Sequence, residues 1–289
     1  MLSYNFFTKL PVPYLILVLF NLITPKVIIA GELQPTSLMQ QETKWLVQAL
    51  QQAHFNKVSI KNLSSRDFIL SYLNKLDKSK LYFNESDVVE FTKRYSPTLI
   101  TFFEQGNLFP GFEIYNSYKS KSIERLDWVT EFLDSEFTFD SNSSYKFDRT
   151  DANWETSEEG LDELWKKLIE FEVLGEVLSS VETNSTSPSL SKGELTNLST
   201  NSKSKVRKRY ERWKKSILEF ESTDVQELYL TTLTQMFDPH TTFMNIKEKE
   251  KFNQTMNNEL VGIGAVLSDI DGYCTITELL PGGPAESSR

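Results

Sequence analysis

Apolar residues recur at every third or fourth position through most of residues 35–229, and this spacing predicts a series of helices. Ser37, with Gln40 three residues later, resembles a capping box at the start of the first helix. Ser65 and Asn84 are expected to open the next two, because serine and asparagine favour the first position of a helix. The apolar face of the first helix is expected to comprise Trp45, Leu46, Ala49, Leu50 and Ala53.

The helical spacing continues through four later segments, namely residues 112–133, 161–178, 205–220 and 225–237. It is interrupted at residues 179–204, which are rich in serine, threonine and asparagine and contain no aromatic side chain. A segment of this composition buries too little apolar surface to offset the entropy lost when it becomes ordered. Residues 179–204 are therefore predicted to be a low-complexity linker.

Strand patterns begin only near the end of the chain. Residues 260–267 are interpreted as a strand that opens with glycine, residues 269–272 as a turn, and residues 273–279 as a second strand. Residues 281–285, Pro-Gly-Gly-Pro-Ala, are expected to form a turn whose second proline is suited to start a helix. Just before the strands, residues 247–256 are expected to form a short charged helix.

These patterns predict a mainly α fold, in which a helical amino-terminal domain precedes the start of a small α+β module. The helical domain is assigned to residues 31–246 and the module to residues 247–289. Residues 1–30 are assigned to a leader that is separate from both.

The leader has the three-part pattern of a secretory signal peptide. Lys9 provides the positive charge, residues 14–23 form an apolar core, and Ala30 is a small residue just before Gly31. A membrane anchor is the alternative, but the apolar run falls well short of the ~18 residues that a membrane span needs. We therefore expect export, removal of the leader near Gly31, and no membrane-spanning segment after that.

Composition narrows the classes of function. The formal charge of −9 argues against a nucleic-acid-binding protein, which would need a basic surface. Cys274 is the only cysteine, so an internal disulfide and a cysteine-rich zinc site are both excluded. His54 and His240 are the only histidines, so a histidine metal centre is unfavourable, and both are interpreted as structural residues rather than general bases. No cofactor is expected, and an exported protein without cysteine pairs suits the bacterial periplasm.

Several motifs, taken in their order along the chain, resemble the tail-specific (carboxy-terminal processing) serine proteases. The helical part contributes Leu73-Asn74-Lys75-Leu76-Asp77 and Leu161-Asp162-Glu163-Leu164-Trp165. The end of the chain contributes Asp238-Pro239-His240-Thr241, then Gly262-Ile263-Gly264-Ala265, then the turn at residues 281–285. The strand, turn and strand after residue 260 resemble the first third of a PDZ module.

This resemblance implies a site. The backbone N–H groups of Gly262, Ile263, Gly264 and Ala265 would receive the terminal carboxylate of a peptide, as in PDZ modules. The alternative is an ordinary glycine-containing start of a strand. The resemblance also places the opposite wall of the peptide groove beyond Arg289, so this chain alone is expected to bind such peptides poorly.

The family's activity is endoproteolysis of proteins selected by their apolar carboxy termini, with a serine nucleophile and a lysine base. The resemblance places that pair beyond residue 289, so the chain by itself is expected to be inactive. Two Ser-x-x-Lys matches, Ser189–Lys192 and Ser202–Lys205, are interpreted as chance. The alternative function is a non-enzymatic module that binds proteins or peptides.

The aromatic residues bear on the partners of the chain. The 20 phenylalanines and 11 tyrosines lie mostly on helical stripes, which favours a role in filling the core. The alternative is that some of them form a docking surface for an adaptor protein or a substrate. Carboxy termini of proteins, and an adaptor, are therefore the candidate partners.

Overall fold

The structure is a computed structural model that describes residues 31–137, 139, 144–184, 192–257, 262–270 and 273–287. The chain divides into two units, Met1–Leu33 and Gln34–Arg289. All helices and strands of the described residues belong to the second unit. The leader assigned to residues 1–30 lies outside the described residues.

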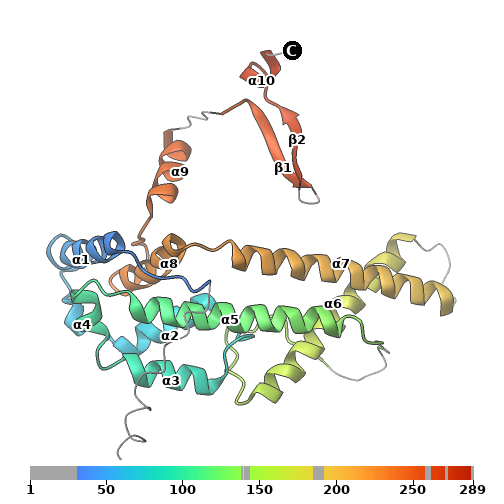
Figure 1. Ribbon diagram of the computed structural model, residues 1–289, viewed down its shortest axis with the longest axis horizontal. Coiled ribbons are helices and arrows are strands. Elements are labelled where there is room, and N and C mark those ends of the chain that lie inside the picture. The colour runs from blue at the N-terminus through green and yellow to red at the C-terminus, as the bar shows by residue number, and fades with distance from the viewer. Residues whose placement is uncertain are drawn as a thin grey trace, which may run out of the picture. The chain divides into compact units, whose positions relative to one another are not determined.

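Helices dominate the described residues, which confirms the predicted mainly α fold (Figure 1). The helices up to residue 257 are α1 (Ser37–Gln52), α2 (Ser65–Leu76), α3 (Glu85–Tyr95), α4 (Leu99–Glu104), α5 (Phe109–Phe132), α6 (Glu158–Asn184), α7 (Lys192–Leu218), α8 (Ser222–Gln235) and α9 (Ile246–Asn257). A short 3-10 helix, Ile60–Asn62, lies between α1 and α2. The chain continues through strands β1 (Ala265–Ile270) and β2 (Tyr273–Leu279) to the short helix α10 (Pro284–Ser287).

The cap of α1 lies one residue before the predicted one. The Thr36 hydroxyl accepts the N–H of Met39 at 3.3 Å, and the Thr36 N–H donates to the Met39 sulfur at 3.5 Å. The prediction of Ser37 as the cap was wrong because Thr36 is the residue with the extended backbone (φ −86°, ψ 164°) that this position requires. At α3 the predicted cap is confirmed, since the Asn84 side chain accepts the N–H of Asp87 at 3.0 Å.

The face of α1 that enters the core differs from the predicted one. The buried residues are Met39, Thr43, Val47 and Leu50, whereas Trp45 is 72% exposed. Trp45 precedes Val47 by two residues, which places it roughly 200° around the helix from that side chain. The prediction was therefore wrong for Trp45, which points away from the core, and for Ala53, which is exposed at the end of the helix.

One aromatic core surrounds Tyr229 of α8. Its ring lies 5.1 and 5.0 Å from those of Phe68 and Tyr72 on α2, and 5.3 Å from that of Phe103 on α4, measured between centroids. A Cβ atom on Gly111 would lie 2.5 Å from the Tyr229 ring, so α5 can approach α8 only with glycine at this position. These contacts confirm the predicted core-filling role for this group of aromatic residues.

A second core lies among α5, α6 and α7; α5 and α7 run alongside one another, and α6 crosses them obliquely (Figure 1). Trp165 of α6 is fully buried there, and its indole N–H donates to the carbonyl of Leu81 at 2.6 Å. Val129 of α5 and Val206 of α7 are also fully buried in this cluster. The indole hydrogen bond therefore ties this core to the segment that leads into α3.

That segment is organised by one buried carboxylate. Asp77, directly after α2, is 2% exposed, and its two oxygens accept the N–H groups of Leu81, Tyr82 and Phe83 at 2.8, 2.9 and 3.0 Å. Three donors on one carboxylate hold these backbone groups in a tight turn. The turn directs Phe83, which is fully buried, into the interior.

Most of the predicted linker is helical. Helix α6 continues to Asn184 and α7 begins at Lys192, while residues 185–191 lie outside the described residues. The prediction of a linker over residues 179–204 was therefore wrong at both ends. Ser202 is only 1% exposed and Val206 is fully buried, because α7 packs against both α5 and α6. Tertiary contacts here override the weak helix propensity of serine, threonine and asparagine.

The two strands form an antiparallel hairpin in which Ala265 lies opposite Leu279. The second strand has the predicted bounds. The first was predicted at residues 260–267, but the backbone of Gly264 has φ +73°, which interrupts an extended chain, and β1 begins at the next residue. It continues to Ile270, so the turn predicted at residues 269–272 was wrong for its first two residues, which pair with β2. The charged helix predicted at residues 247–256 is confirmed as α9.

Candidate functional site

The candidate carboxylate loop is the segment Gly262–Ile263–Gly264 that leads into Ala265, the first residue of β1. Its carbonyl groups face the turn after β2. The carbonyl of Gly264 accepts the N–H of Leu280 at 2.8 Å, and that of Ile263 accepts the N–H of Ala285 at 2.8 Å. The loop is thus fixed to the turn at residues 280–285 by two backbone hydrogen bonds.

Unlike the carbonyls, two N–H groups of the same loop lack an internal hydrogen-bond partner among the described residues. Those of Ile263 and Gly264 donate no hydrogen bond to any residue that the structure describes. The Ile263 side chain is 56% exposed. Two neighbouring N–H groups without an internal acceptor can receive an anion such as a carboxylate.

The two glycines of the loop have different structural roles. Gly264 combines φ +73° with a close contact, since a Cβ atom there would lie 2.7 Å from the Cα of Gly283. Gly262 has no such constraint, because a Cβ atom there would meet nothing within 4 Å. The structure therefore requires glycine at position 264 for the backbone itself, independently of any ligand.

The hairpin is a sheet of only two strands among the described residues, and no described strand pairs with either outer edge. Its apolar side chains are correspondingly exposed: Leu267 is 49% and Ile276 is 55% exposed. A peptide laid against such an edge could form backbone hydrogen bonds.

The turn after α8 contains His240 and Asp238. The Asp238 carboxylate accepts the His240 N–H at 3.2 Å and the Thr241 hydroxyl at 3.1 Å. The His240 side chain is 90% exposed, and His54, beyond the end of α1, lies 3.3 Å from the Thr241 hydroxyl through Nε2. The Thr241 hydroxyl donates its hydrogen bond to Asp238 and not to His54, and the His240 ring contacts the Asp238 carboxylate rather than a hydroxyl. Neither histidine is therefore arranged to activate a nucleophile.

The Ser-x-x-Lys match at Ser202 and Lys205 does not form a catalytic pair. Ser202 is buried in the helical core, whereas the Lys205 side chain is 60% exposed and its ammonium lies 3.6 Å from Glu176. A lysine base needs a desolvated ammonium next to its nucleophile, and neither condition is met here. The other match includes Ser189, which lies outside the described residues.

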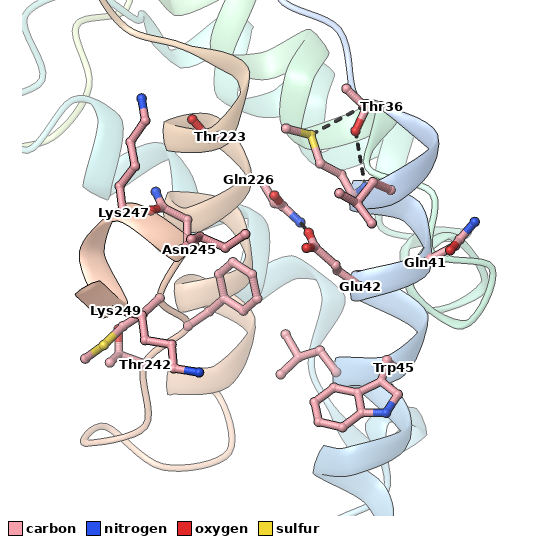
Figure 2. Close-up of a pocket in the computed structure, with 16 residues that line it drawn as sticks. Thr36, Gln41, Glu42, Trp45, Thr223, Gln226, Thr242, Asn245, Lys247 and Lys249 are labelled. Carbon is pink, nitrogen blue, oxygen red and sulfur yellow. Dashed lines mark hydrogen bonds between the residues drawn. The ribbon is translucent and has the colours of Figure 1, made fainter. Parts of the chain in front are cut away.

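A large apolar groove is a feature that the sequence did not reveal. It has a volume of about 1010 Å³ and is formed by α1, α8, residues 242–245 and the start of α9 (Figure 2). One wall carries Leu38 and Trp45, which are 58% and 72% exposed. The facing wall carries Met244 and Ile246, which are 38% and 68% exposed. We refer to this site as the α1/α8 groove.

The floor of the α1/α8 groove is polar and well ordered by hydrogen bonds. Gln226 of α8 is 2% exposed, and its amide donates to the Glu42 carboxylate at 2.8 Å, across from α8 to α1 (Figure 2). The wall formed by residues 242–245 is fixed to α8, since the Thr231 hydroxyl donates to the Phe243 carbonyl at 3.0 Å. The Asn245 N–H donates to the Glu227 carboxylate at 3.2 Å.

The described residues contain no group of three or more His, Cys, Asp or Glu side chains that could hold a metal ion. In the part of the chain that the structure describes, no helix is both long enough and apolar enough to cross a membrane.

Comparison with known families decides the relationship. Residues 46–247 match the model of the tail specific protease N-terminal domain, from within α1 to the start of α9. The chain belongs to the tail-specific protease family. The resemblance inferred from the sequence motifs is thereby confirmed for the helical part of this family member.

One relative is the tail-specific protease of Haemophilus influenzae, which is 26% identical to this chain over 250 residues. The alignment covers 86% of this chain and 34% of the relative. This tail-specific protease family member therefore spans about a third of the length of that curated relative.

Proposed function

We propose that this chain is the amino-terminal portion of an exported, periplasmic tail-specific serine endopeptidase that selects proteins by their apolar carboxy termini. The helical domain would act as a platform, and residues 247–289 would begin the PDZ module that binds the terminal peptide. The family relationship supports the protease assignment. The secretory pattern of residues 1–30 supports export.

The observation that carries the peptide-binding part of this proposal is the loop at Gly262–Ala265. The carbonyls of Ile263 and Gly264 are hydrogen-bonded to the turn at residues 280–285, whereas their N–H groups have no acceptor among the described residues. A peptide carboxylate would accept hydrogen bonds from those N–H groups, and the peptide would add as a strand beside the hairpin.

We assign the catalytic serine and lysine of the family to no residue that the structure describes. The described match at Ser202 and Lys205 lacks the burial and the contact that a serine–lysine pair needs. We therefore assign no peptidase activity to these 289 residues by themselves.

The second candidate function is a non-enzymatic protein-binding module, and the α1/α8 groove favours it. The nucleotide sequence that follows the codon for Arg289 discriminates between the two. A continuing frame that encodes the rest of a PDZ module and a serine–lysine core supports the protease. A stop codon followed by unrelated sequence supports the binding module.

Peptide affinity tests the carboxylate loop. A fluorescent peptide with an apolar free carboxy terminus is compared with the same peptide ending in a carboxamide, using a form of the protein continued through a complete module. Because hydrogen bonds to a charged group contribute about 1.5–3 kcal/mol, the free acid should bind about 10- to 100-fold more tightly. Equal affinity for the two peptides would show that the loop does not bind a carboxylate.

A further inference from the structure

We propose that the α1/α8 groove binds an amphipathic α-helix of a partner protein, with apolar residues on the buried face of that helix and carboxylates along one edge. The inference goes beyond the proposed peptidase function and does not depend on the carboxylate loop. It rests on the apolar walls of the groove, on the secondary structure of those walls, and on the charge of one rim.

The apolar walls have the size and composition of an interaction site. Leu38, Trp45, Met244 and Ile246 are all large and at least 38% exposed, and they face one cavity from two sides. Contiguous exposed apolar surface on a soluble protein marks a binding site for another molecule. Of these four residues, Trp45 is expected to contribute most to the binding energy, because tryptophan is enriched among the residues that dominate binding energy at interfaces.

The secondary structure of the walls favours a helix over an extended peptide. An extended peptide binds by adding to the free edge of a sheet. In this groove the wall of α1 and the floor of α8 are helices whose backbone groups are paired internally, and residues 242–245 are hydrogen-bonded to side chains of α8. No free backbone edge is thus offered by these elements.

The spacing along α1 also fits a helix. Leu38, Glu42 and Trp45 all line the groove and lie at positions i, i+4 and i+7, so they form one ridge along α1. Ridges of this spacing pack into the grooves between the side chains of a second helix. A partner helix with apolar residues at the same spacing would bury Leu38 and Trp45 together.

The rim formed by α9 supplies the charge preference. Lys247 and Lys249 line the groove on this side (Figure 2). The Lys247 ammonium is 2.6 Å from Glu221, whereas Lys249 forms no ion pair with any described residue. On the floor, Glu42 is hydrogen-bonded to Gln226. Gln226 is a neutral amide, so Glu42 keeps its negative charge on the floor, and the positive charge of the lining that is unpaired among the described residues is that of Lys249 at the α9 rim. A partner with carboxylates only at the edge that meets α9 is therefore favoured.

The experiment uses the exported form of the chain and two designed helical peptides. Both carry leucine at positions i, i+3, i+4 and i+7. One has glutamate beside the leucine stripe, and the other has lysine there. Fluorescence anisotropy of the labelled peptides measures their affinities. We expect the glutamate peptide to bind more tightly, with the preference decreasing as salt is added.

Variants locate the site. Trp45→Ala should weaken binding of the glutamate peptide by about tenfold or more, and Lys249→Glu should reverse the preference between the two peptides. Phe55→Ala and Lys251→Glu are matched controls, because both residues are exposed and lie outside the groove lining. Circular dichroism confirms that the fold is retained, and Ile246→Ala provides a second apolar variant from the opposite wall.

Three results would overturn the proposal. The first is no binding of either peptide, and the second is equal binding of both. The third is a dimer of the chain, seen by sedimentation velocity, that Trp45→Ala dissociates, because the occupant of the groove would then be a second copy of the chain.

Discussion

A Cβ atom on Gly264 would lie 2.7 Å from the Cα atom of Gly283, so the backbone before β1 and the backbone after β2 are in direct contact. Side chains do not approach to this distance without a shift of one segment. The contact joins the two ends of the hairpin at the point where the candidate carboxylate loop meets β1. It makes the geometry of that loop dependent on a residue nearly twenty positions away.

Gly264→Ala should therefore loosen the hairpin. The left-handed backbone costs an alanine about 1–2 kcal/mol, and the contact with Gly283 adds to that cost. Amide hydrogen exchange in β1 and β2 should become about 5- to 30-fold faster. Gly262→Ala is the matched control and should leave exchange unchanged, because a Cβ atom there meets nothing within 4 Å. The same exchange rates in both variants would contradict the contact.

Asp77→Asn should destabilise the helical domain. The carboxylate accepts three backbone N–H groups, and an amide keeps only one acceptor oxygen for them. Leaving a buried donor without a partner costs about 1–3 kcal/mol in the free energy of unfolding, which urea denaturation measures. The exposed Asp151→Asn should change this free energy much less.

The stability difference between wild type and Asp77→Asn should change with pH in a defined direction. Burial raises the pKa of Asp77 above its usual value of 3.8, although three backbone N–H groups and Lys80 oppose the rise. The folded chain therefore holds this proton more tightly than the unfolded chain, so the contribution of Asp77 to stability decreases as the pH rises from 3.8 through the folded-state pKa. The stability difference between wild type and Asp77→Asn should narrow over that window. A difference that widens instead would mean that the carboxylate has a lowered pKa.

Ser202→Leu should destabilise the packing of α7. Ser202 is 1% exposed, and inserting a larger side chain into a packed interior typically costs about 1–3 kcal/mol. Ser204→Leu, two residues later on an exposed position of the same helix, should cost little. If both variants unfold at the same urea concentration as wild type, residues 192–204 do not pack as α7 does in this structure.

The purified chain should hydrolyse no peptide with a free apolar carboxy terminus above background. The buried Ser202 and the ion-paired Lys205 cannot act as nucleophile and base, so Ser202→Ala and Lys205→Ala should not change the background rate. Activity that survives repurification and is lost in either variant would contradict this expectation.

The helices that could be predicted are those with a strong local signal. The Asn84 cap, the charged segment at residues 247–256 and the bounds of β2 follow from neighbouring residues, and the structure confirms all three. The early part of α7 has no such local signal. Its helix is supported by contacts with α5 and α6, which composition does not reveal.

The two candidate sites also differ in whether neighbouring residues reveal them. The loop at Gly262–Ala265 is visible in the sequence because its residues are consecutive. The α1/α8 groove is not visible, because Trp45 and Ile246 are about two hundred positions apart and meet only in the folded chain. One signal was available: Leu38 and Trp45 lie seven residues apart on α1, off the stripe formed by Met39, Thr43, Val47 and Leu50.

The hydrogen bond between Glu42 and Gln226 joins residues 184 positions apart, and those from His54 to Thr241 and from Asn56 to Phe237 span similar distances. On a ribosome that adds about 5–20 residues per second, α1 emerges about 10–40 s before α8 exists to pack against it. During that interval the side of α1 that faces α8 in the folded chain has no α8 to pack against. The core between α1 and α8 can therefore form only after most of the helical domain has been synthesised.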